Sequence, residues 1–129
     1  MGNIDWKNLY KVRIGNSDES FQKHEIVKLL VVMKILQKNR RKDFLRIYTE
    51  FKLEEVGLKP DVYMEDIKNK SVICYEIQKE CDKAYIQDRV KKYNAYEVYN
   101  FTVDLVIIPL KGLSDNIQEL NKQLDKYVV

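Results

Sequence analysis

Between Ser20 and Arg40, apolar residues are so dense that a helix would be apolar on nearly every side from Ile26 to Leu36. The stretch before it, "NSDES", supplies capping and acidic residues that favour a helix N-terminus. The pattern therefore predicts a core helix over about 20–40, buried against a sheet on one side. Its apolar run includes two lysines and is too short to span a membrane.

A strand pattern follows. Apolar and polar side chains alternate over "FLRIYTEFKLE", which is typical of a half-buried strand. Pro60 then opens a second strand, and a third strand, "SVICYEIQ", follows a turn around Lys68 and Asn69. The second and third strands are therefore expected to form a hairpin.

Helical periodicity returns from Asp82 to about Val98, with Ile86, Val90 and Tyr93 on one side. The next segment, "FTVDLVIIPL", predicts a strand that is buried on both faces, as strands in parallel sheets are. The tail, "SDNIQELNKQLDKYVV", predicts an amphipathic final helix. Its capping residues are Asp115 and Gln118, and its apolar stripe consists of Ile117, Leu120, Leu124 and Tyr127.

These elements predict an α/β fold with a mixed central sheet of about four strands flanked by helices. The helix between the third and fourth strands implies a right-handed crossover, which makes those two strands parallel. Residues 1–16 lack clear periodicity, and we interpret them as an N-terminal arm or short extended segment. With 129 residues and no linker or internal repeat, the chain 1–129 is expected to form a single domain.

Composition narrows the possible functions. A net charge of +3 excludes a basic coat over the whole surface, so contacts with nucleic acid would come from local clusters of the 23 Lys and Arg residues. Two cysteines and one histidine, without a Gly-rich phosphate loop, remove the usual supports for zinc sites and nucleotide hydrolysis. No secretory segment is recognised, so we expect a cytoplasmic protein that makes no membrane contact.

The predicted hairpin brings two acids together. If it is symmetric about its tip, Asp61 lies opposite Glu76, and Gln78 shares their side of the sheet. Carboxylates that face each other in this way repel unless one is protonated or a cation lies between them. Mg²⁺ accepts one or two carboxylates together with water and phosphate oxygens, and the backbone carbonyl of Ile77 is a further candidate ligand. A register shifted by a residue or two would instead put both acids on a solvated face.

A helix bearing an acid, then "KPDV", then "YEIQK", then a helix and a buried strand resembles the PD-(D/E)XK, or restriction-endonuclease-like, nuclease superfamily over about 19–110. The stretch "KHEIVKLL" and the short chain are similar to the archaeal Holliday junction resolvases, small homodimers that cut four-way DNA junctions during recombination. The "EIQ" variant resembles competence-protein nucleases and some viral members, in which glutamine replaces the usual lysine.

This resemblance implies a metal-dependent DNA endonuclease that uses Mg²⁺, with Mn²⁺ able to substitute, on branched or duplex DNA. It assigns Asp61 and Glu76 as metal-binding acids and puts Gln78 at the position of the catalytic lysine. Glutamine can orient a water molecule but supplies no positive charge, and strand alternation sends Lys79 to the opposite face. A lysine of the following helix, such as Lys83, is one possible substitute.

The resemblance also assigns an acid of the first helix to the site. Glu25 matches this position and Glu19 competes with it, while helix capping or a favourable interaction with the helix dipole is an alternative role for either residue. We interpret His24 as a surface or interface residue. The alternative function is a catalytically inactive nucleic-acid-binding or assembly module of the same fold.

Basic clusters and apolar surfaces suggest partners. Basic residues at a helix C-terminus could bind phosphates or simply stabilise the helix. The candidate nucleic-acid-binding residues are Arg40, Arg41, Lys42, Lys83, Lys91 and Lys92. A homodimer is expected, formed through the final helix or through the arm around Trp6 and Tyr10, although an amphipathic final helix could instead cover its own sheet.

Overall fold

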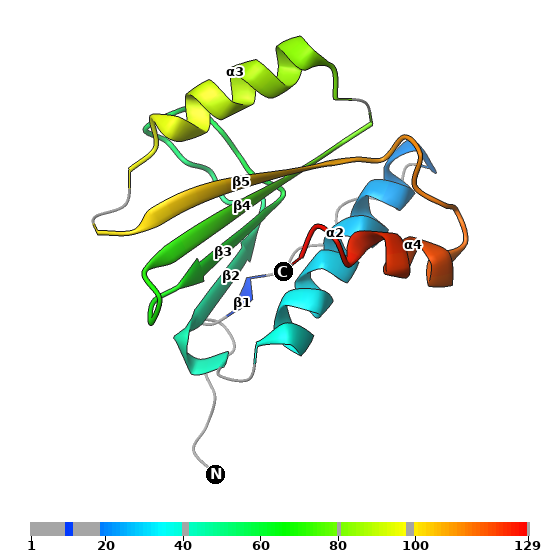
Figure 1. Cartoon of the computed structure of the whole chain (residues 1–129), viewed down its shortest axis with the longest axis horizontal. Coiled ribbons are helices and arrows are strands. Elements are labelled where there is room, and N and C mark those ends of the chain that lie inside the picture. The colour runs from blue at the N-terminus through cyan, green and yellow to red at the C-terminus, as the bar shows by residue number, and fades with distance from the viewer. Residues whose placement is uncertain (1–9, 12–18, 40–41, 80, 98–99, 129) are drawn as a thin grey trace.

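The structure is a computed structural model of the chain that describes residues 10–11, 19–39, 42–79, 81–97 and 100–128. It confirms an α/β fold with a mixed sheet flanked by helices (Figure 1). The helical elements are α2 (Glu19–Lys38), the short 3-10 helix η1 (Lys42–Phe44), α3 (Lys83–Asn94) and α4 (Ile117–Leu124). The strands are β1 (Tyr10–Lys11), β2 (Leu45–Thr49), β3 (Val62–Asp66), β4 (Ser71–Gln78) and β5 (Thr102–Pro109).

The sheet has the strand order β1-β2-β3-β4-β5. Strands β2, β3 and β4 form an antiparallel meander, and β5 returns through α3 to lie parallel to β4, as predicted. The short strand β1 adds a fifth strand, parallel to β2, from within the segment that we expected to be an arm. The remainder of residues 1–16 lies outside the described residues.

The hairpin of β3 and β4 has the predicted register. Tyr63 pairs with Cys74 and Glu65 pairs with Val72, so the shifted register that would solvate both acids is wrong. The turn is stabilised by Asp66, whose Oδ1 accepts a hydrogen bond from the Asn69 backbone N–H at 3.1 Å. Val62 pairs with Tyr75, so continuing this register by one residue places Asp61, which directly precedes β3, opposite Glu76.

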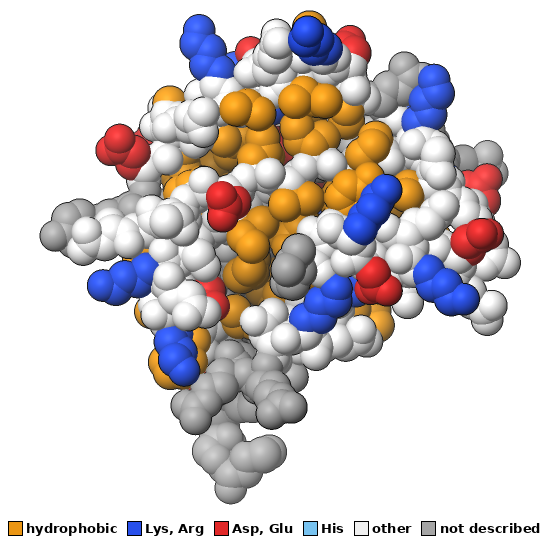
Figure 2. Space-filling model, viewed as in Figure 1, with side chains coloured by type: hydrophobic (Ala, Val, Ile, Leu, Met, Phe, Trp, Pro, Cys, Tyr) orange, Lys and Arg blue, Asp and Glu red, His pale blue; other side chains and the backbone are white. Residues whose placement is uncertain are grey.

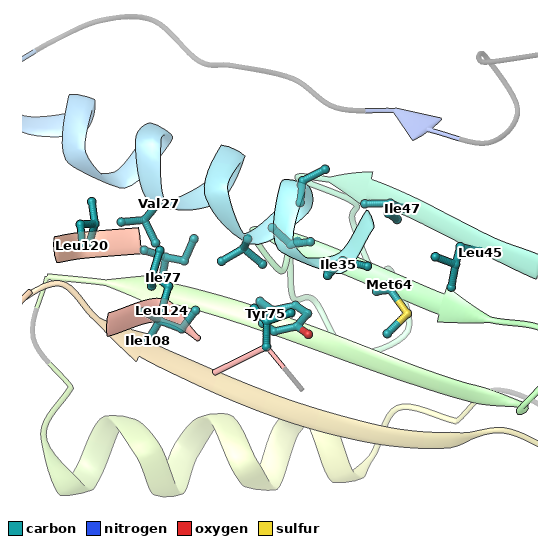
Figure 3. Close-up of a cluster of buried hydrophobic side chains, with 14 residues drawn as sticks. Val27, Ile35, Leu45, Ile47, Met64, Tyr75, Ile77, Ile108, Leu120 and Leu124 are labelled. Carbon is teal, nitrogen blue, oxygen red and sulfur yellow. The ribbon is translucent and has the colours of Figure 1, made fainter. Parts of the chain in front are cut away.

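The main core lies between the sheet and the pair of helices α2 and α4 (Figure 3). Alternate residues of β2 point into it, with Leu45 and Ile47 almost completely buried. Helix α4 buries Leu120 and Leu124 in the same core, which leaves Ile117 as the exposed member of its stripe. The final helix therefore covers its own sheet, and its stripe is not a free surface for a dimer.

Helix α3 packs on the other face of the sheet, over a smaller cluster that includes Cys74 and Tyr93. Ile86 and Val90, which the helical periodicity put on the same side as Tyr93, are exposed at 39% and 42%, whereas Tyr93 is buried. The helix is rotated so that a stripe of residues four positions apart is turned toward the sheet. This stripe consists of Tyr85, Arg89 and Tyr93.

Strand β5 lies at the edge of the described sheet, and most of its residues are exposed or half-buried, which corrects the expectation that it is buried on both faces. Thr102 and Asp104 are exposed, and Ile108 is its one fully buried residue among those described. Figure 2 shows hydrophobic side chains at the surface between α3 and this edge. The apolar residues of β5 pack against β4 and against the helices on both faces at one end of the strand. In the described strand order, no further strand pairs with its other edge.

No helix in the described part of the chain is long and apolar enough to cross a membrane.

The C-terminal segment is joined to α2 by an ion pair that allows a stability test. The Lys34 ammonium is almost fully buried, and its Nζ lies 2.6 Å from Asp125 Oδ1. We expect Asp125→Asn to lower the melting temperature by a few degrees, because a buried ammonium then loses its partner. The exposed pair of Lys23 and Asp115 provides the control, and Asp115→Asn should have little effect.

The same pair gives a pH dependence. Its hydrogen bond with Lys34 lowers the pKa of Asp125, so the pair contributes stability above the unfolded-state pKa and loses it as the pH falls through the folded-state value. The difference in melting temperature between the wild type and Asp125→Asn should therefore be present at neutral pH and disappear in acid. A difference that stays constant down to low pH would contradict this assignment.

Candidate active site

Asp61 lies at a bend directly before β3, where the sheet meets the N-terminal half of α2. Its backbone N–H donates to the Tyr75 carbonyl at 3.0 Å, and its Oδ2 accepts from the Ile77 backbone N–H at 2.7 Å. The side chain is thereby fixed against the main chain of β4, next to Glu76. The sequence motif and the hairpin register together explain this placement.

His24 of α2 contacts the same carboxylate. Its Nε2 lies 3.0 Å from Asp61 Oδ1, and its Nδ1 lies 3.6 Å from Glu25 Oε1. The hydrogen bond with Asp61 raises the pKa of His24 above its ordinary value, although burial opposes this. The side chain of His24, which we interpreted as a surface or interface residue, is 17% exposed and also contacts the candidate acid Asp61.

Glu25 belongs to a group of charged residues around the buried Lys28, formed by α2 and by the residue that follows β2. Its Oε2 lies 2.5 Å from the Nζ of Lys28, whose side chain is completely buried and whose Nζ is also 3.6 Å from Glu50 Oε1. The structure thus links Glu25 to Asp61 through His24, and it also gives Glu25 a structural partner. Glu19, the competing acid, begins α2 one and a half turns earlier, and its side chain lies outside the described residues.

Glu76 is buried on the face that α3 covers. Tyr93 Oη donates to its Oε1 at 2.5 Å, and Tyr85 Oη lies 3.4 Å from its Oε2. Burial raises the pKa of Glu76, the Tyr93 hydrogen bond lowers it, and the neighbouring charge of Asp61 raises it further. The two acids therefore interact electrostatically, although each is held by its own partners.

Gln78 is the last residue of β4, two positions after Glu76, and so shares its face of the sheet. Its backbone carbonyl accepts from the Leu110 N–H at 2.7 Å, which holds this end of β4 against the segment after β5. Lys79 is exposed. The side chain of Gln78 is partly accessible, as a residue that orients a substrate or water molecule must be.

The sequence analysis missed the three α3 residues that surround Glu76. Arg89 places its guanidinium carbon 5.0 Å from the centre of the Tyr85 ring, and its charge lowers the pKa of Glu76. The signal was the four-residue spacing of Tyr85, Arg89 and Tyr93. The aliphatic periodicity of the helix does not reveal this stripe, because Tyr85 and Arg89 are not part of it.

The predicted nucleic-acid contacts are only partly described. Lys83, Lys91 and Lys92 are exposed on α3, and Lys92 Nζ lies 3.3 Å from Asp88 Oδ2. Lys42 begins η1, but its side chain lies outside the described residues. Arg40 and Arg41 lie outside them altogether, so their assignments stay predictions.

The donor chemistry of the site fits a hard divalent cation. Among the residues that the structure describes, no three His, Cys, Asp or Glu side chains are gathered as a metal-binding group. Mg²⁺ bound to phosphate substrates needs only one or two carboxylates, with water and substrate oxygens completing its shell. Asp61 and Glu76 are such a pair, and a cation would relieve their repulsion, which adds to the burial that chiefly raises the Glu76 pKa.

A cavity of about 590 Å³ lies elsewhere, toward the C-terminal end of α3. Tyr96 and Phe101 line it, and it touches the candidate site only where Tyr93 forms part of its wall.

Comparisons of the chain with protein-family models, curated proteins and solved structures gave no match.

Proposed function

We propose that the protein is a metal-dependent endonuclease that hydrolyses DNA phosphodiester bonds. One observation carries this proposal: the Asp61 carboxylate is fixed by the Ile77 N–H beside the buried Glu76. The order of helices and strands, with three antiparallel strands followed by a parallel crossover, supports it as the order that the PD-(D/E)XK resemblance implies.

The roles of the residues follow from their positions. Asp61 and Glu76, with the Ile77 backbone carbonyl, would hold Mg²⁺ or Mn²⁺, which when bound supplies an activated water molecule and neutralises phosphate charge. His24 and the Ile77 N–H orient the Asp61 carboxylate. Tyr93 orients Glu76, and Gln78 is positioned to orient the attacking water or a phosphate oxygen.

The resemblance to resolvases suggests branched DNA, including four-way junctions, as substrate and a homodimer as the working form. The burial of Leu120 and Leu124 moves the candidate dimer surface away from the final helix. The arm around Trp6 and Tyr10 remains a candidate. A cytoplasmic location is part of the same proposal.

The second candidate function is an inactive nucleic-acid-binding module of the same fold. A specific observation favours it, because each acid is already bound by protein groups: Asp61 by His24, Glu76 by Tyr93 and Glu25 by Lys28. Gln78, in addition, supplies no charge at the position of the expected lysine.

The purified chain separates these candidates. It would be incubated with plasmid, linear duplex, single strands and a four-way junction, in Mg²⁺, in Mn²⁺ and with chelator. Metal-dependent cleavage supports the endonuclease, and preferential cleavage of the junction supports a resolvase. Binding without cleavage of every substrate supports the inactive module. A mass of one chain at all concentrations would remove the homodimer.

A further inference from the structure

In the proposed endonuclease, no residue has yet been assigned to supply positive charge to the phosphate. The inference that follows rests on that proposed function. Phosphodiester hydrolysis develops negative charge on the phosphate oxygens, and fixed positive groups aimed at that charge supply much of the catalysis. Gln78 cannot act as such a group. The role requires a cation that lies beside the acids and remains accessible to a polymeric substrate.

The nearby lysines do not meet both conditions. Lys28 is completely buried, with its Nζ 2.5 Å from Glu25 Oε2, so it cannot touch DNA in this arrangement. Lys79 follows Gln78 directly and so points to the opposite face of the sheet. Lys83 is exposed at the first turn of α3, and the described hydrogen bonds of Glu76 come from Tyr85 and Tyr93 instead.

Arg89 meets both conditions. It is partly exposed, and its guanidinium carbon lies 5.0 Å from the centre of the Tyr85 ring, whose hydroxyl lies 3.4 Å from Glu76 Oε2. An aromatic face holds a guanidinium in place while leaving its N–H edge available. Tyr85 also hydrogen-bonds with the Arg89 side chain, and the Arg89 Nε is buried without a hydrogen-bond partner among the described groups, so the remaining N–H groups of the guanidinium would be the ones to meet a phosphate.

We propose that Arg89 is a catalytic residue that binds the non-bridging oxygens of the scissile phosphodiester, with Tyr85 as its support. The guanidinium matches two phosphate oxygens with paired N–H donors, which a lysine cannot do. In the reaction, the oxygen of water bonds to phosphorus while the bond from phosphorus to one deoxyribose oxygen breaks. The water loses a proton to solvent, the leaving oxygen gains one, and Arg89 keeps its protons throughout.

The spacing of three residues on one face of α3 supports this assignment. Tyr85, Arg89 and Tyr93 lie four residues apart, so one helical stripe supplies a support for the cation, the cation itself and a hydrogen-bond donor for the metal-binding acid. Helix α3 would then orient Glu76 and deliver the positive charge together. The missing lysine of β4 is replaced by a residue from the crossover helix.

The test compares Arg89→Gln with Arg89→Lys, and Lys122→Gln serves as a control with the same change of charge, from an exposed position on α4 outside the candidate site. Cleavage of a duplex or junction oligonucleotide would be measured under single-turnover and steady-state conditions in Mg²⁺, and binding to the same DNA would be measured in Ca²⁺. Melting temperatures of all variants show whether they fold. Added guanidinium chloride at millimolar concentration tests chemical rescue.

We expect Arg89→Gln to reduce kcat about 100-fold or more with a smaller change in KM, Arg89→Lys to retain part of the rate, and guanidinium to restore part of it to the Gln variant. The control should cut at nearly the wild-type rate. If the wild type cuts and Arg89→Gln cuts equally well, the role of Arg89 is wrong while the proposed function stands.

If the wild type binds DNA but does not cut it, catalysis is excluded for both proposals. An unchanged affinity in Arg89→Gln would then also exclude a phosphate contact by Arg89, whereas an affinity at least several-fold weaker, with Lys122→Gln unaffected, would support the contact alone. A folded Arg89→Gln protein whose loss of rate guanidinium cannot rescue, and whose loss appears equally in Lys122→Gln, would point to a general loss of positive surface charge and overturn the assignment.

Discussion

Replacing Asp61 with Asn is expected to reduce metal-dependent cleavage about 1,000-fold or more. The substitution keeps an oxygen that can accept the Ile77 N–H, now at 2.7 Å, but removes the negative charge that a divalent cation requires. Glu76→Gln should have a comparable effect on cleavage. Because Glu76 is buried, the neutral side chain should leave the melting temperature in chelator unchanged or higher.

The control for this pair is Asp104→Asn, an exposed acid on the edge strand β5 of the same sheet. It changes the net charge by the same amount and should cut at nearly the wild-type rate. Folded Asp61→Asn protein that retains most of the metal-dependent cleavage would remove Asp61 from the site. The endonuclease proposal would then lose its principal support.

Glu25→Gln is expected to destabilise the fold by about 3 kcal/mol, because it leaves the ammonium of the buried Lys28 without its nearest counter-charge. Denaturant unfolding measures this change. The double variant Glu25→Gln with Lys28→Met should recover most of the lost stability, since the buried charge is then gone. Gln22→Glu, an exposed change on the same helix, provides a control for helix charge.

The double variant also separates the two roles of Glu25. If Glu25 only neutralises Lys28, the stabilised double variant should cut DNA at a rate close to that of the wild type. If Glu25 joins Asp61 and Glu76 in the catalytic machinery, cleavage should stay low even though the fold is restored. A stable Glu25→Gln single variant would contradict the buried ion pair itself.

The local pattern predicted the elements well. The dense apolar run of α2, the alternation of β2 and the turn at the tip of the β3–β4 hairpin are properties of neighbouring residues, so they can be read without the rest of the chain. The placement of Asp61 next to β4 followed in the same way, because a short turn fixes the pairing of every residue along both strands.

The faces of the helices were harder to predict. The aliphatic residues Ile86 and Val90 favoured one orientation of α3, but the buried Glu76 favours hydroxyl donors, and the structure turns Tyr85 and Tyr93 toward it instead. The burial of β5 was overestimated for a related reason. An edge strand and a central strand can have the same apolar composition. The strand order of the sheet decides that β5 is an edge strand.

By itself, the sequence determined the succession of helices and strands, the register of the hairpin and the identity of its acids, because these depend on spacings of a few residues. Only the tertiary structure brought His24 to Asp61 and Arg89 to the neighbourhood of Glu76, since these contacts join α2 and α3 to strands far away in the chain. Short-range periodicity sets which side of an element is apolar. The packing of the helices on the two faces of the sheet determines which charged side chains lie close together.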